Sequence, residues 1–129
     1  MIAVKRAWPF VPEVRLYHSA EKAMRHMNKH GIDAVLIEGS GAQTWYNEEN
    51  TEAVVLVTYK GDTTDERALL VHEAVHVVLT HYDKYLGEDE IGDEFMAYGV
   101  QVVSHGLLSA HDRWRKGRAT DDKQEKKGE

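Results

Sequence analysis

Residues 68–80 read ALLVHEAVHVVLT, and this stretch decides the fold. It is apolar almost all round, which predicts the body of a helix that is buried in the domain. We expect this helix to run from Thr63 to Tyr82. Thr63 and Glu66 stand three residues apart, which permits a capping box in which both side chains bond backbone N–H groups at the start of the helix.

Three ionisable residues interrupt the apolar helix and form the pattern HExxH, namely His72, Glu73 and His76. The i, i+4 spacing puts both imidazoles on one face, roughly 5–6 Å apart at Cβ, where they can share one metal ion. Glu73 lies about 100° round the helix from His72, so it borders the metal and can hold a bound water. A hydrogen-bonded cluster of core histidines is the structural alternative.

Catalytic zinc usually takes three protein ligands and a water, so one ligand lies outside the motif. Glu94 is the strongest candidate, because it begins the apolar part of the next expected helix, eighteen residues past His76. Asp93, Glu90 and His81 are its rivals. The two acids also have a structural explanation, since carboxylates are favoured at helix N-termini.

The segment His72-Glu73-x-x-His76, followed by Glu94-x-x-Ala97, resembles the ImmA/IrrE-type minimal gluzincins. In that family the HExxH helix precedes a helix with a ligand glutamate in an E-x-x-A context. The resemblance implies an α+β, zincin-like fold with an N-terminal helix, a small sheet of three or more strands and two metal-bearing helices. It also implies Zn²⁺ bound by His72, His76 and Glu94.

Members of this family cut protein substrates, often repressors in mobile genetic elements and phages. The resemblance therefore implies a phage or prophage metallopeptidase. It covers roughly residues 56–108, and only the HExxH motif and the downstream glutamate are specific. Met96, Tyr98 and Gly99 vary the longer apolar block found in the family, so the substrate is not carried over.

The other expected elements are shorter. A helix over Ser19–Lys29 has a capping serine at its start and Gly31 as its stop. The first dozen residues, which contain both prolines, predict an extended arm. Apolar or alternating runs predict strands over residues 34–37, 43–47 and 53–59. A second long helix is expected from about Ile91 to Ala110 or beyond.

Length and composition indicate one domain over residues 1–112 and a charged, flexible tail over 113–129. The absence of cysteine excludes a disulfide framework and thiol catalysis. A net charge of -6 argues against nucleic-acid binding by the domain. No secretory signal and no run of membrane-spanning length is visible, so we expect a cytoplasmic protein without a membrane partner.

These observations predict a zinc-dependent endopeptidase in which Glu73 accepts the proton of the zinc-bound water and passes it to the leaving amine. Its partner is a protein or peptide substrate. Tyr98 is the candidate donor to the developing oxyanion, with Gln101 and His105 as alternatives on the same helical stripe. The strand over Val54–Tyr59, if it edges the cleft, can bind an extended peptide by strand addition.

Two other classes stay open. The first is a phage or prophage accessory protein that keeps a zinc-bound peptidase fold and recognises a partner without cutting it. The second is a metal-free helical interaction domain. The remaining histidines receive structural assignments: His26 and His30 are predicted to be exposed on a helix surface, while His18, His105 and His111 are predicted to be surface or supporting residues.

Overall fold

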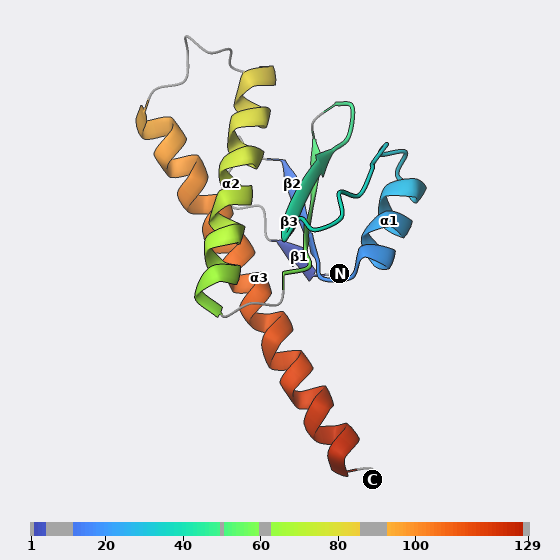
Figure 1. Cartoon of the computed structure of the whole chain (residues 1–129). Coiled ribbons are helices and arrows are strands. Elements are labelled where there is room, and N and C mark those ends of the chain that lie inside the picture. Colours follow the sequence, from blue (N-terminus) through green and yellow to red (C-terminus); the bar gives the residue numbers. More distant parts are fainter. Residues whose placement is uncertain (1, 5–11, 50, 60–62, 86–92, 128–129) are drawn as a thin grey trace.

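A four-stranded mixed sheet forms the centre of the molecule (Figure 1). The computed structural model describes residues 2–4, 12–49, 51–59, 63–85 and 93–127, with side chains for 12–49, 51–59, 63–81 and 96–117. The strands are β1 (Ile2–Val4), β2 (Glu13–Tyr17), β3 (Ala42–Tyr46) and β4 (Glu52–Val57), in the spatial order β1-β2-β4-β3. The β2–β4 pair is parallel, and the two outer pairs are antiparallel.

Helices cover both faces of the sheet, which gives an α+β fold. Helix α1 (Ala20–Lys29) lies on one face, whereas α2 (Thr63–Tyr85) and α3 (Asp93–Lys127) lie on the other (Figure 1). Strand β4 is buried on both sides: Val55 and Val57 join the core under α2 and α3, while Val54 and Leu56 join the core under α1. This explains its continuous apolar sequence, because a strand buried on both faces does not alternate.

The predicted first helix is confirmed with its boundaries. Ser19 is the N-cap of α1, and its hydroxyl accepts a hydrogen bond from the backbone N–H of Lys22 at 3.3 Å. The chain leaves the helix through Gly31, whose φ of +68° lies in the left-handed region that glycine adopts without strain. Met27 and Ala23 are fully buried and pack α1 onto the sheet.

Helix α2 is confirmed, but it is not buried all round. Leu70, Ala74, Val77 and Val78 are fully buried, whereas Leu79 is 45% exposed. The proposed capping role of Glu66 is also wrong. Its carboxylate turns towards α3 and accepts hydrogen bonds from His111 and Arg115 instead of reaching back to the start of its own helix.

Two strands of the sheet were not expected, and one expected strand does not form. The N-terminal arm contributes β1, and the segment after Pro12 forms β2. Residues 34–37 have no strand structure, with Val35 80% and Ile37 66% exposed. The backbone N–H and C=O of Ile37 are bonded to the side-chain amide of Gln43, so this segment meets β3 through a side chain and not through a strand ladder. Four apolar residues in a row do not distinguish a strand from an extended connection.

Helix α3 begins close to the expected residue and continues to Lys127. Its C-terminal part extends past the sheet in Figure 1. The first residues of the predicted tail still contact the domain: Trp114 stacks on His18, and Arg115 pairs with Glu66. The boundary at residue 112 stays a prediction. No helix within the described part of the chain is long and apolar enough to span a bilayer.

Candidate metal centre

The two histidines of the HExxH motif converge on one point. His72 and His76 are both exposed on α2, and their Nε2 atoms lie 3.1 Å apart. The rings meet edge to face, with centroids 4.7 Å apart and planes at 78°. Two nitrogen ligands at 2.0–2.1 Å from a tetrahedral zinc ion would be separated by about 3.3 Å. The separation therefore fits chelation of one ion, and it also fits a hydrogen bond between the two imidazoles.

Glu73 lies on the adjacent face of α2, in the interface with strand β3. It is 5% exposed and accepts a hydrogen bond from the Thr44 hydroxyl. Because Thr44 belongs to β3, the outermost strand on this side of the described sheet, Glu73 packs against an edge strand. This carboxylate is thus held by a specific donor beside the histidine pair.

Tyr46 shares the α2-facing side of β3 with Thr44, two residues away. Burial raises the pKa of its phenol; the nearby Thr80 hydroxyl lowers that pKa and the charge of Glu73 raises it. Its hydroxyl oxygen is buried and has no partner in hydrogen-bonding geometry among the described residues, with Thr80 close by but outside that geometry. Sequence reasoning missed both Thr44 and Tyr46, because nothing local says that this weakly patterned strand packs against the HExxH helix.

The third ligand stays a prediction. Glu94 is the second residue of α3, but its side chain and those of Asp93 and Glu90 lie outside the described residues. His81 is described and is buried, only 8% exposed. It follows His76 by five residues, which places it about 140° round the helix. His81 therefore faces the interior while the histidine pair faces outward.

The three proposed oxyanion donors stand on the outer side of α3. Tyr98 is 51% exposed, and Gln101 and His105 are exposed as well. The neighbouring stripe, with Val103 and Leu107, is the one buried against the core. The structure thus confirms that the three share a stripe, and the role of Tyr98 stays a prediction.

A buried polar network joins α2 to α3 and β2. His111 is 1% exposed, with its Nε2 3.1 Å from Glu66 and its Nδ1 2.9 Å from His18 Nε2. The His18 ring stacks on Trp114 with a centroid separation of 3.7 Å. His111 was predicted to be a surface or supporting residue. It is not on the surface, because its side chain is fully buried; it is a supporting residue that joins α3 to α2.

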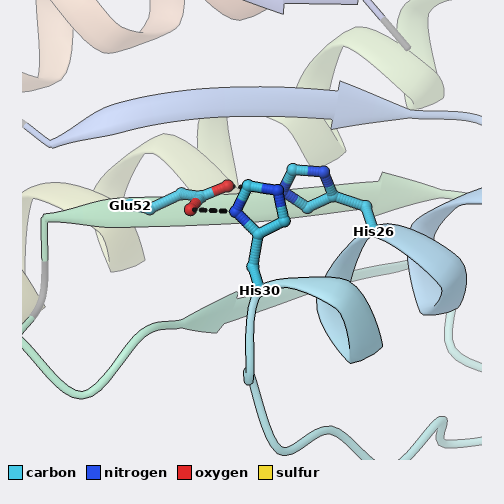
Figure 2. A group of neighbouring side chains, drawn as sticks. All are labelled: His26, His30 and Glu52. Atoms are coloured by element: carbon cyan, nitrogen blue, oxygen red, sulfur yellow. Dashed lines mark hydrogen bonds and ion pairs between the residues drawn. The ribbon is translucent and has the colours of Figure 1, made fainter.

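A second cluster of ligand-type side chains lies on the opposite face of the sheet. His26 and His30 of α1 meet Glu52 of β4 (Figure 2), and one potential ligand atom from each lies within 4.8 Å of the other two. Within the described residues, it is the one place where three or more potential metal ligands lie this close together. The prediction of an exposed imidazole is correct for His30 and wrong for His26, whose side chain is only 12% exposed; both rings are turned towards the Glu52 carboxylate (Figure 2).

Comparison with known protein families, with curated proteins and with solved structures finds no match to this chain in any of the three.

Proposed function

We propose that the chain is a zinc-dependent metallopeptidase of the gluzincin type that cleaves peptide bonds within protein substrates. The observation that carries the proposal is the pairing of two exposed, convergent imidazoles with a buried glutamate on the adjacent face of the same helix. A purely structural histidine pair has no need of a carboxylate held beside it. His72 and His76 would hold the metal with Glu94 as third ligand.

A zinc ion held by these residues would act as a Lewis acid and would lower the pKa of a coordinated water to about 7. Glu73 is the group that takes a proton from the attacking water and delivers it to the leaving amine. The Thr44 hydroxyl keeps the carboxylate in place during both transfers. Tyr98 is the proposed hydrogen-bond donor to the developing oxyanion.

The outer edge of β3, which pairs with no other strand within the described residues, offers a place for an extended substrate. The expectation that the strand over residues 54–59 edges the cleft is wrong, because β4 lies between β2 and β3. The Gly41 carbonyl accepts backbone hydrogen bonds from Thr58 and Tyr59, directly after β4, and the Asn47 N–H donates to Glu52 of β4. Alternation along an antiparallel strand then turns the backbone groups of Thr44 and Tyr46 outward. A peptide added to this edge would lie beside Glu73.

Substitution of Glu73 by glutamine tests the mechanism. The change keeps size and hydrogen bonding but removes the base, so zinc content and melting temperature should stay near wild type. Cleavage should fall by about 10²–10⁴-fold. Wild type and variant are incubated with a proteome from a candidate host, and new peptide termini are counted by mass spectrometry. Glu21→Gln, which alters an exposed carboxylate on α1, is the matched control.

The outcomes separate the competing functions. New termini with wild type and Glu21→Gln, but not with Glu73→Gln, support the peptidase. Identical termini at identical rates with Glu73→Gln would show that Glu73 is not the base. Zinc binding without cleavage, together with retention of one partner by both wild type and Glu73→Gln, favours the accessory binding protein instead.

A further inference from the structure

The cluster of His26, His30 and Glu52 has the geometry of a chelating site (Figure 2). His26 Nε2 lies 2.5 Å from Glu52 Oε1, and His30 Nδ1 lies 3.4 Å from Glu52 Oε2. The two rings are stacked, with centroids 4.0 Å apart and planes at 25°. Ligand atoms bound at 2.0–2.2 Å to one tetrahedral ion are about 3.3–3.6 Å apart. Small side-chain rotations would bring these atoms, now within 4.8 Å, onto one ion.

Two regular elements place these ligands independently. The i, i+4 spacing of His26 and His30 brings both rings to the same side of α1. Glu52 begins β4 and, like Val54 and Leu56, faces α1 rather than α2. The site therefore lies across the sheet from His72 and His76, and the two centres share no residue.

Glu52 supplies the negative charge of the cluster. Burial raises the pKa of Glu52, but the hydrogen bond from His26 and the nearby charges of His26, His30 and Arg15 together hold it below the usual value of 4.5. Glu52 is therefore a ready anionic ligand at neutral pH. Arg15 Nε donates to Glu52 Oε1 at 3.1 Å, which orients the carboxylate and leaves Oε2 directed at His30.

We propose that His26, His30 and Glu52 form a second metal site, for a divalent transition metal such as Zn²⁺ or Co²⁺. Two imidazoles and one carboxylate are the ligand set that these borderline ions favour. The His30 side chain is 38% exposed, so solvent can supply a further ligand. A metal held there joins α1 to β4 and stabilises the packing of α1 on the sheet. The proposal does not depend on the proposed peptidase function.

Metal stoichiometry of the full, tag-free chain provides the test. The protein is stripped with a chelator, equilibrated with buffered Zn²⁺, and analysed for bound zinc by mass spectrometry. We expect about two zinc ions per chain in wild type and about one in His72→Ala/His76→Ala. His26→Ala/His30→Ala should also bind about one, and the chain with all four substitutions should bind none.

Two further substitutions are made in the His72→Ala/His76→Ala protein, which keeps only the second site. Glu52→Gln is the test, and Arg25→Ala is the control. Glu52→Gln keeps the shape of the side chain and should abolish the remaining zinc, as well as the visible absorption of bound Co²⁺. Arg25 lies on the exposed side of α1, the helix that carries His26 and His30. Arg25→Ala should change neither the bound zinc nor the Co²⁺ absorption. Zinc should raise the melting temperature of the His72→Ala/His76→Ala protein, since only the folded state offers the site. It should not do so once Glu52→Gln is added.

The second site is overturned if His26→Ala/His30→Ala, folded by circular dichroism, binds as much zinc as wild type, or if His72→Ala/His76→Ala binds none. Failure of the first site has a different signature. In that case His72→Ala/His76→Ala would match wild type, while the zinc that remains would still depend on His26 and Glu52.

Discussion

Thr44, on the edge strand β3, donates its hydroxyl hydrogen to the carboxylate of Glu73 on α2. Thr44 pairs with Val55 of β4 in the antiparallel register, so its side chain points to the same side as the core under α2. The contact fixes the carboxylate of the HExxH motif against the sheet. It also ties the position of the proposed base to the strand proposed to receive the substrate.

Replacing Thr44 with valine should show how much the hydrogen bond to Glu73 contributes to stability. Valine keeps the shape of threonine but leaves a buried carboxylate without its donor, at a cost of about 1.5–3 kcal/mol in the free energy of unfolding. Zinc content should not change, because Glu73 is not among the proposed ligands. Urea unfolding and metal analysis measure both effects. Thr44→Ser retains the hydroxyl and should recover most of the stability; a stable Thr44→Val protein would mean that Glu73 does not depend on this donor.

The elements with strong local signals were predictable from the sequence. Helix α1 has a capping serine and a terminating glycine, and β4 is a run rich in β-branched residues. Each element is therefore indicated by its own local sequence. The HExxH motif likewise needs only helical spacing to bring His72 and His76 together. In these cases the neighbours along the chain determine the outcome.

The rest of the candidate sites depends on contacts that are distant in sequence. Thr44 meets Glu73 across twenty-nine positions, and His26 meets Glu52 across twenty-six. These pairs exist only because β4 is inserted beside β2 and because the two sheet faces receive different helices. Local patterns do not specify strand order. Residues 34–37 show the same limit, since an apolar run does not say whether a partner strand is available.

The choice of third zinc ligand makes a direct prediction. Glu94→Ala should weaken zinc binding by His72 and His76 far more than Glu90→Ala, because one of three protein ligands is lost. The measurement is competition with a chromophoric chelator, carried out in the His26→Ala/His30→Ala background so that one site is titrated. Equal effects of the two substitutions, or a larger loss from Asp93→Ala or His81→Ala, would assign the third ligand elsewhere.

The lowered pKa of Glu52 predicts a specific dependence of stability on pH in the metal-free protein. The folded state binds the Glu52 proton more weakly than the unfolded state, for which 4.5 is the reference pKa. The contribution of Glu52 to stability is therefore fully present above pH 4.5 and is lost as the pH falls through the lower folded value.

Urea unfolding between pH 6 and pH 3, with a chelator present, measures this contribution. Wild type should lose more stability across that window than Glu52→Gln, which has no proton to bind. Glu21→Gln is the control, since its exposed pair with Arg25 is worth little. Parallel curves for wild type and Glu52→Gln would show that the charge of Glu52 is not stabilised by its neighbours.

Shortening the chain should locate the end of the stable domain. Residues beyond Gly117 are mostly charged or polar and offer little apolar surface, so a chain that ends at Gly117 should unfold with nearly the free energy of the full chain. A chain that ends at Asp112 loses the Trp114 ring stacked on His18 and the guanidinium of Arg115 paired with Glu66. Since Arg115 is partly exposed, the loss should be about 1–3 kcal/mol.

Chemical unfolding of both shortened chains, with Arg115→Ala in the full chain as a comparison, separates the contacts from helix length. If the two contacts carry the effect, Arg115→Ala should reproduce part of the loss and Trp114→Ala the remainder. A large loss on ending the chain at Gly117 would contradict this account, because it would mean that residues 118–129 stabilise the domain despite their polar composition. Equal stability of both shortened chains would instead show that the network around Glu66 is complete with His111 alone.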